Sequence, residues 1–242
     1  MRDSWHAIRR GSIALAMVLL GTGPLDAQIQ SGQFLISVRA EHMRYAESAA
    51  LETSGAVGVE TMYFLTSHLA VGFQASVARP WTKGEYFPLM RHTYWTPNSA
   101  NDTTLLYVVS QQVTAFDYGL QAEYRLALGR FEPMVQAGVG RYTFFLDPQS
   151  QPQSDRERRT FSGLAYSVGG GLSFAVSEDA RIMVTVSDRI YTGFDRDNLS
   201  LADRLLREDR FPNPLPPPPP EEDVIHNLRI SAGFSFAPGR GR

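Results

Sequence analysis

The sequence predicts an all-β protein, an eight-stranded antiparallel up-and-down transmembrane β-barrel with short periplasmic turns and long extracellular loops. Three observations predict this fold class. Apolar residues occupy every second position in eight segments, and the connections between these segments alternate between short and long. The chain also begins with a pattern typical of exported proteins.

The alternation is clearest in residues 119–128, where Leu120, Ala122 and Tyr124 alternate with Gln121 and Glu123. Successive side chains of a strand point to opposite faces, so this segment has one apolar and one polar face. We expect the apolar face to contact lipid and the polar face to line the barrel. The predicted strands are Gln33–Tyr45, Ser54–Phe64, Leu69–Arg79, Val113–Ala127, Phe131–Leu146, Thr160–Val176, Ala180–Phe194 and Val224–Phe236.

The connections after the second, fourth and sixth predicted strands are short, namely Leu65–His68, Leu128–Arg130 and Ser177–Asp179. The other connections are longer. If the chain enters from the periplasm, every short connection is periplasmic and every long one is extracellular. This asymmetry, with an even number of strands, is typical of bacterial outer-membrane barrels.

The first segment, Met1–Ala27, is interpreted as a secretory signal peptide. It carries Arg2, Arg9 and Arg10 before an apolar run and ends in small residues that suit cleavage before Gln28. The apolar run is shorter than the roughly 20 residues that a membrane helix needs. We therefore expect one outer-membrane barrel domain over Gln28–Arg242.

Composition excludes several other classes. Removing the signal peptide takes three of the 23 basic and two of the 25 acidic residues, which leaves a net charge of −3. Such a balance predicts no nucleic-acid partner. The chain has no cysteine, so it has no disulfide framework and no thiolate chemistry.

Aromatic residues are expected in two girdles, one at each membrane interface. Those near the periplasmic ends of their strands are Phe34, Tyr63, Tyr124, Phe131, Phe174 and Phe236. Those near the extracellular ends are Tyr45, Trp81, Phe116, Phe144, Phe161, Tyr191 and Phe194.

The last predicted strand contains Arg229, Ser231, Phe234 and Phe236, a polar and a small residue followed by two aromatics at alternate positions. This pattern resembles the C-terminal assembly signal of the small eight-stranded bacterial outer-membrane barrels, of the type of outer membrane protein A, outer membrane protein X and the opacity proteins. Ser231 stands where glycine is more usual, and Ala237–Arg242 extend past Phe236. The resemblance implies outer-membrane lipid, lipopolysaccharide and the barrel assembly machinery as partners, and it names no extracellular ligand.

The inward parity carries charges of both signs. An eight-stranded interior is just wide enough for side chains, and an unpaired buried charge is costly, so we expect a closed lumen in which these charges pair. The alternative is a narrow ion pathway gated by the same pairs. Besides Asp117, the predicted lumen charge network is Arg39, Glu41, Glu60, Glu123, Arg125, Glu132, Arg181, Arg189 and Arg229.

These observations predict a non-enzymatic outer-membrane protein with a structural or surface-interaction role. The alternatives are a narrow, porin-like channel or transporter for small or hydrophobic molecules, and a lipid A-modifying enzyme. His226 near Asp223 is the candidate base for the enzyme, but no histidine is followed two positions later by serine. We expect no catalytic, cofactor or metal site, and Glu221 to Asp223 is interpreted as a solvated charge run.

The long connections contain further features. Residues 80–101 are rich in aromatics, and the alternation in residues 104–112 predicts that the fourth strand continues into a protruding hairpin. Ser200–Asp203 resembles a capping box, and Pro216–Pro220 predicts a stiff polyproline II spacer.

The alternation of connections makes a topological prediction. With both termini in the periplasm, Pro80–Thr103 and Asp195–Asp223 lie outside the cell. An epitope placed in Pro214–Pro220 should therefore be labelled by antibody on intact cells. Labelling only after the outer membrane is permeabilised would contradict this topology.

Overall fold

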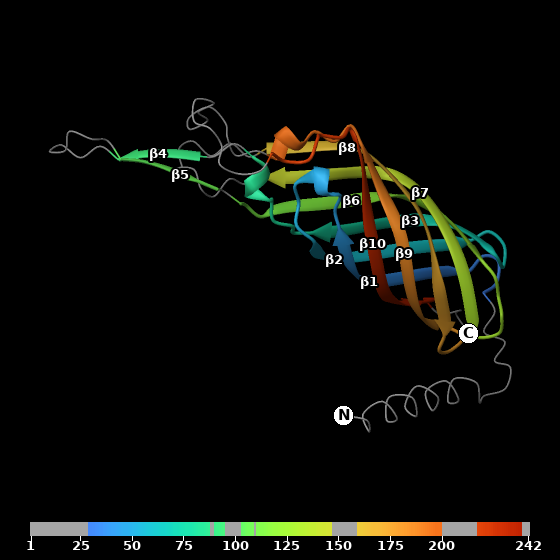
Figure 1. The fold of residues 1–242 in the computed structure, drawn as a ribbon. Coiled ribbons are helices and arrows are strands. Elements are labelled where there is room, and N and C mark those ends of the chain that lie inside the picture. Colours follow the sequence, from blue (N-terminus) through green and yellow to red (C-terminus); the bar gives the residue numbers. More distant parts are fainter. Residues whose placement is uncertain are drawn as a thin grey trace, which may run out of the picture.

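The computed structural model describes residues 29–87, 90–94, 103–108, 110–146, 159–199 and 217–238. Eight antiparallel strands form a closed barrel in the order β1-β10-β9-β8-β7-β6-β3-β2, which confirms the predicted fold class (Figure 1). Their bounds lie within two residues of the predicted ones. The barrel strands are β1 (Phe34–Arg44), β2 (Ser54–Phe64), β3 (Leu69–Ala78), β6 (Val113–Arg125), β7 (Phe131–Leu146), β8 (Arg159–Ala175), β9 (Ala180–Thr192) and β10 (Val224–Phe236).

The two ends of the barrel differ in their connections. At the turn end, where β1 begins and β10 ends, residues 65–68, 126–130 and 176–179 join neighbouring strands. Gly129 has a φ of 68°, a left-handed conformation that glycine adopts without steric cost. The opposite end, the loop end, carries the long connections and three short 3₁₀ helices, η1 (Glu47–Ala49), η2 (Gly84–Tyr86) and η3 (Arg196–Leu199). Among the described residues, no helix is long and apolar enough to cross a membrane.

A separate hairpin extends from the loop end. Strands β4 (Met90–Tyr94) and β5 (Thr103–Tyr107) form their own two-stranded sheet, which projects away from the barrel (Figure 1). The sequence predicted a hairpin continuous with the fourth barrel strand, and this continuity is wrong. The chain between β5 and β6 is not part of either strand, and there the backbone of Gln111 bonds to Thr82. The Gln111 carbonyl oxygen accepts a hydrogen bond from the Thr82 N–H at 2.8 Å, and the Gln111 N–H donates one to the Thr82 hydroxyl at 3.0 Å.

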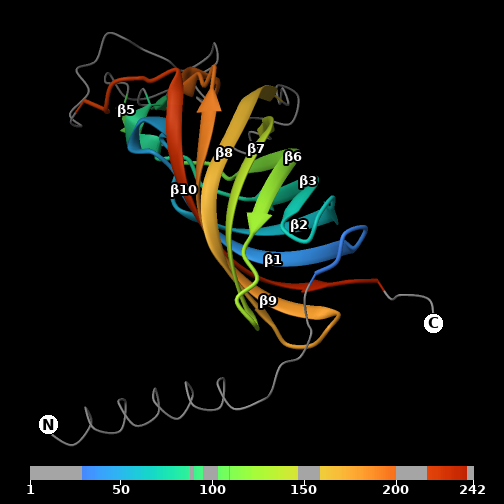
Figure 2. The ribbon, with the colours of Figure 1, turned by 90° about the vertical axis from the view of Figure 1, so that its right-hand side faces the viewer.

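The pairing register sets the width of the barrel. Paired residues can be followed once around the barrel, from Val38 on β1 across each neighbouring strand to Val224 on β10. The pairing of β10 with β1 places Val224 level with position 48 of the chain, ten residues beyond Val38. The register therefore shifts by ten residues per circuit. A shift of this kind tilts the strands, as Figure 2 shows, and an eight-stranded barrel encloses a space that side chains fill.

The outer wall is apolar. Leu120, Val135 and Val57 are 65%, 61% and 58% exposed, and similar residues cover the outer face of every barrel strand. A continuous apolar surface that covers every barrel strand is unfavourable in water and suits contact with lipid. At the turn end, Phe34, Tyr63, Tyr124 and Phe236 are exposed on the outside, as predicted for a girdle.

The girdle predicted at the loop end is partly wrong. Phe116 and Trp81 are exposed, whereas the other members of the predicted set turn away from the outside. Tyr118 and Tyr166 complete the outer girdle beside Phe116. Tyr45, Phe144 and Tyr191 have the inward parity and are buried, and Phe194, which follows Gly193 with its φ of 65° beyond the end of β9, is buried as well.

The outer wall supports a depth test on β9. Val184→Arg should lower the free energy of unfolding by about 2–4 kcal/mol, because it places a cation on the lipid-facing wall near the bilayer midplane. Ile190→Arg, on the same face but nearer the loop end, should cost no more than about 1 kcal/mol. Urea unfolding in lipid vesicles measures both. Equal costs, or a larger cost at Ile190, would show that the wall does not face lipid in this way.

Candidate functional site

Among the side chains that the structure describes, the lumen holds ten that are charged and buried. The most exposed of them, Glu41, is 6% exposed. Five arginines face five carboxylates, so the formal charges cancel. The arginines are Arg39, Arg125, Arg181, Arg189 and Arg229, and the carboxylates are Glu41, Glu60, Asp117, Glu123 and Glu132. We call these ten residues the lumen charge network.

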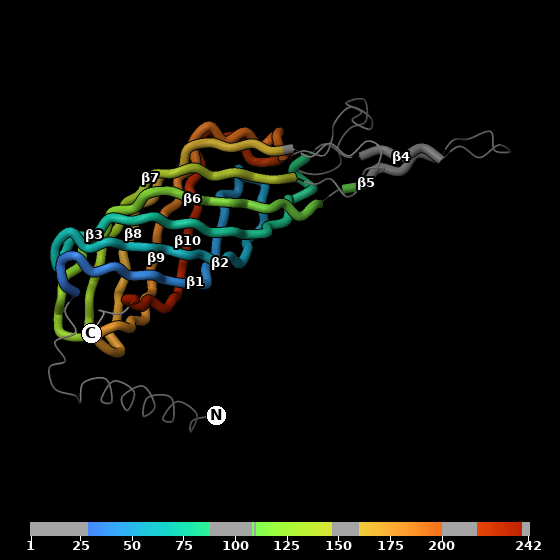
Figure 3. Tube along the Cα trace, turned by 180° about the vertical axis from the view of Figure 1, so that it is seen from behind, coloured from blue at the N-terminus to red at the C-terminus, as the bar shows by residue number. Residues whose placement is uncertain are grey.

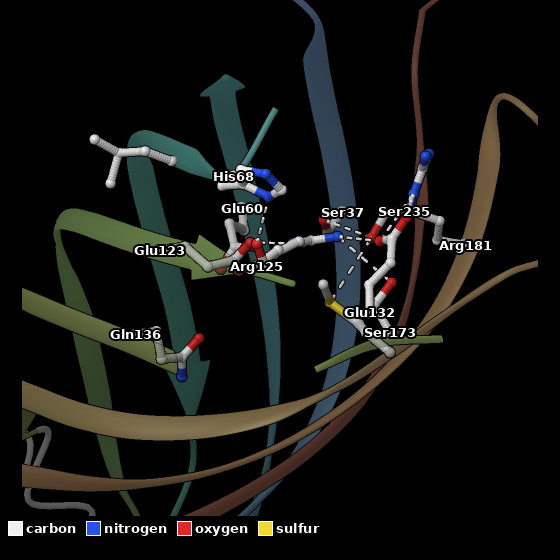
Figure 4. Close-up of polar contacts among 12 residues, drawn as sticks. Ser37, Glu60, His68, Glu123, Arg125, Glu132, Gln136, Ser173, Arg181 and Ser235 are labelled. Atoms are coloured by element: carbon white, nitrogen blue, oxygen red, sulfur yellow. Dashed lines mark hydrogen bonds and ion pairs between the residues drawn. The ribbon is translucent and has the colours of Figure 1, made fainter. Parts of the chain in front are cut away.

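Four members meet at the turn end (Figure 4). Arg125 is paired through Nε with Glu123, two positions away on the same face of β6, and through Nη1 with Glu132 on β7 at 3.2 Å. Arg181 on β9 approaches both carboxylate oxygens of Glu132 through Nε at 3.2 Å. Glu132 on β7 therefore joins an arginine of the neighbouring strand β6 to an arginine of β9, two strands away in the other direction.

A second group lies in the middle of the lumen. Arg39 is paired with Glu60 at 2.8 Å, and the carbonyl oxygen of the Gln74 side chain accepts hydrogen bonds from both Arg39 and Arg229, at 3.3 and 3.2 Å. Glu41 lies between the same two arginines, 3.6 Å from Arg39 and 3.9 Å from Arg229. This group connects β1, β2, β3 and β10.

Two glycines make room for this central group. Gly58 and Gly233 lie opposite Arg39 on the strands to either side. A Cβ atom at Gly233 would lie 2.6 Å from Cγ of Arg39, and one at Gly58 would lie 2.5 Å from a carboxylate oxygen of Glu41. At Gly233 the Cβ atom would also lie 2.6 Å from the backbone carbonyl oxygen of Val38, so this position requires a residue without a side chain, whereas at Gly58 the flexible end of Glu41 would have to move.

The third group is at the loop end of the network. Arg189 is paired with Asp117, and Asp117 also accepts a hydrogen bond from the Tyr191 hydroxyl at 3.2 Å. The Tyr191 ring also belongs to an aromatic layer, so this residue connects the polar network with that layer. The prediction that Tyr191 belongs to the outer girdle is wrong, and the parity that Tyr191 shares with Arg189 indicates the inward direction.

The aromatic layer fills the barrel mouth. Tyr142 stacks on Tyr191 with ring centroids 4.4 Å apart, and Phe144 stacks on Phe161 at 5.1 Å. Phe194 packs against Phe144 at 6.0 Å. We call these five residues the mouth cluster. It places an apolar seal between the charges of the lumen and the loops outside.

Polar contacts hold the loops over the mouth cluster. Arg196 donates a hydrogen bond to the carbonyl oxygen of Pro219 at 2.7 Å and is paired with Glu221 at 3.2 Å. Ser48 donates to Glu222 at 2.8 Å. Residues 221–223 are thus only partly the solvated charge run that the sequence predicted, because two of the carboxylates anchor the chain to η1 and η3.

Tyr86 of η2 adds another link by donating a hydrogen bond to Glu47 at 2.7 Å. This bond raises the pKa of the Tyr86 phenol above its ordinary value, because ionisation would break it. The predicted capping box at Ser200–Asp203 and the first part of the proline-rich segment lie outside the described residues, as does the predicted signal peptide Met1–Ala27.

An apolar group covers part of the turn end. Leu35, Met62, Phe64 and Ala70 point inward from β1, β2 and β3 and pack with Ile29 and Ala237. The Arg125 guanidinium lies 5.5 Å from the centre of the Phe64 ring. The network is therefore bordered by apolar side chains at the turn end and by the mouth cluster at the loop end.

The predicted assembly signal lies on β10, which closes the barrel by pairing with β1. Arg229 and Ser231 point inward, and Phe234 and Phe236 are exposed on the outer wall. Ser231 shares a hydrogen bond of 2.5 Å with Thr185 on β9. Arg229 thus belongs both to the signal and to the lumen charge network.

His226, the candidate base, lies on the outer wall, with its Nδ1 atom 2.6 Å from a carboxylate oxygen of Asp188. Its partner is Asp188, not the Asp223 considered from the sequence. On its own strand and face, Val224 and Leu228 flank it, so β10 supplies no hydroxyl nucleophile beside the ring. In the described part of the chain, no group of three or more histidines or carboxylates is placed to hold a metal ion.

The network makes a stability prediction. Glu132→Gln should lower the free energy of unfolding by about 3–5 kcal/mol, because it removes a buried charge that two arginines contact. Asp188→Asn is the control, since it changes an exposed contact with His226 and should cost less than about 1 kcal/mol. Urea unfolding in vesicles measures both. Similar small costs would show that the buried pairs contribute little.

No protein-family model and no curated protein match the chain. The crystal structure of Neisserial surface protein A is similar over 84% of this chain and 96% of that one, with 11% identity and a TM-score of 0.51. The outer membrane protein OprG from Pseudomonas aeruginosa is 13% identical over 87% of this chain and 98% of its own, with a TM-score of 0.44.

Ail, the attachment invasion locus protein of Yersinia pestis, is 14% identical over 86% of this chain and 100% of its own, with a TM-score of 0.42. At such identities the likeness concerns the fold. The closed barrel, its apolar outer wall and its aromatic girdles agree with it. The chain has the fold of the small eight-stranded bacterial outer-membrane β-barrels, and this fold indicates the outer membrane as its location.

Proposed function

We propose that this chain is a non-enzymatic outer-membrane protein in which the barrel is a closed scaffold and the extracellular surface has a structural or surface-interaction role. The observation that carries the proposal is the filling of the lumen. Ten charged side chains are buried within it, and the mouth cluster lies above them.

A filled lumen argues against transport. Long side chains such as Arg39 and Arg229 reach across the interior and share partners, so the ion pairs occupy the cross-section that a water column would need. Separating the pairs would leave charges unpaired in a site of low dielectric, at a cost of several kcal/mol. The same interactions that close the lumen therefore stabilise the barrel.

The extracellular side offers the surface for interaction. The hairpin of β4 and β5 extends beyond the barrel, where its sheet is separate from the barrel sheet. Near the loop end, the outer wall carries Arg44 and Arg141, and Arg141 donates a hydrogen bond to Ser162 at 2.8 Å. Cations at this height support contact with the phosphate groups of lipopolysaccharide. The outward aromatic residues of β10 support its role as the segment that the barrel assembly machinery recognises.

Planar-bilayer recording tests the closed scaffold. The unmodified protein should show no large, steady conductance. The double variant Phe144→Ala, Tyr191→Ala, which removes two rings of the mouth cluster, should also show no steady conductance, because the ion pairs that fill the lumen below the cluster remain. A large and steady conductance from the unmodified protein would overturn the proposal in favour of a channel.

The non-enzymatic part of the proposal has its own measurement. Lipid A from cells that express the chain should have the same mass as lipid A from cells that express an unrelated barrel. A mass shift that disappears in the His226→Ala variant would identify the protein as a lipid A-modifying enzyme and would overturn this part.

A further inference from the structure

The chain enters the barrel through a short turn at the turn end. Residues 29–33 precede β1, and the Gln33 N–H donates a hydrogen bond to the carbonyl oxygen of Gln30 at 3.2 Å. Gly32 has a φ of 82°, in the left-handed region that glycine adopts without steric cost. Beyond this turn Ile29 is 4% exposed, whereas residues 30–32 are exposed. We call residues 29–33 the N-terminal strap.

The buried end of the N-terminal strap packs into the apolar group at the turn end. Ile29 joins inward side chains of β1, β2 and β3, which lie side by side in Figure 3, and Ala237 beyond the end of β10. Ser37 and Ser235 share the inward parity of Leu35 and Ala237 and lie two positions further into the barrel, where Ser37 donates a hydrogen bond to Ser235 at 3.0 Å. Ile29 and the apolar group therefore lie between this polar layer and the turn end.

The N-terminal strap is held by different interactions at its two ends. Next to β1, Gln33 accepts a hydrogen bond from the Phe64 N–H at 2.9 Å, and the Gly32 N–H donates one to the Phe64 carbonyl oxygen at 2.8 Å. These two bonds extend the ladder between β1 and β2. At the far end, the contact of Ile29 with the apolar group is made by an apolar side chain. A contact of this kind has no directional bond to break, so the far end can separate from the barrel while the ladder stays intact.

We propose that the N-terminal strap is a lid that opens and closes the turn end of the lumen, with Gly32 as its hinge and Ile29 as the side chain that holds it closed. The open state exposes the apolar group and brings solvent to the polar layer of Ser37 and Ser235. The lid goes beyond the proposed function, because it controls access to one end of the lumen while the lumen charge network fills the interior in both states. Failure of the lid would leave the conductance expected of the closed scaffold unchanged.

Single cysteines measure access to the two ends of the lumen, because the chain itself has no cysteine to react. Ser235→Cys places a thiol in the polar layer behind the lid, at a position that is 0% exposed. Ala165→Cys places one among the buried residues of the loop end, also at a position that is 0% exposed. The rate at which N-ethylmaleimide modifies each thiol of the folded full chain in detergent reports how often that end opens.

Two lid variants act on different parts of the strap. Ile29→Ala removes buried carbon atoms from the closed state and should speed modification of Ser235→Cys about tenfold. Gly32→Ala should also speed it, because alanine is strained at a φ of 82°, although its Cβ would meet nothing closer than the Tyr63 hydroxyl at 4.0 Å. Gly129→Ala is the matched control, because it introduces the same kind of strain at a φ of 68° in a turn at the same end but outside the strap. It should leave the rate unchanged.

The loop-end thiol shows whether the effect is local. Neither lid variant should change the modification of Ala165→Cys, and heat-modifiable gel migration verifies that each variant is folded. Unchanged modification of Ser235→Cys in both lid variants would overturn the lid and show that the apolar group closes the turn end without the strap. Equal acceleration at both thiols, or acceleration by Gly129→Ala, would also overturn it, because the variants would then loosen the whole barrel.

Discussion

The closure of eight strands with a register shift of ten residues is the constraint on which the rest of the structure depends. It leaves an interior that side chains must fill. Because the apolar residues of each strand already face lipid, the polar parity has to fill it. Charges in that space are stable only as pairs, which explains why the five arginines and five carboxylates balance.

The strands and their faces were predictable from the sequence because both follow from a period of two, which needs no knowledge of neighbouring strands. The placement of Tyr45, Phe144 and Tyr191 was not predicted. Aromatics near strand ends were interpreted as girdle residues from their height alone. The direction of Tyr191 could have been predicted from its parity, because residues two positions apart in a strand share a face and Arg189 points inward.

The partners within the network could not be predicted from the sequence for a different reason. The contact of Arg181 with Glu132 joins β9 to β7, and the contact of Arg229 with Gln74 joins β10 to β3. Such pairs depend on the paths that the long side chains take across the interior. Neither the periodicity of the sequence nor the register of adjacent strands determines these paths. Glycines such as Gly233 show this dependence, because their role is visible only beside the side chain that they accommodate.

Arg229 lies on the last strand, and two of its partners, Glu41 and Gln74, lie on the first and third strands. Until β10 joins β1, Glu41 and Gln74 at the centre of the lumen lack one of their two cations. The pairing of β10 with β1 is therefore also the step that neutralises the interior. A partly assembled barrel remains electrostatically incomplete at its centre, and completion of the charge pairs favours closure over any open sheet that could persist in the membrane.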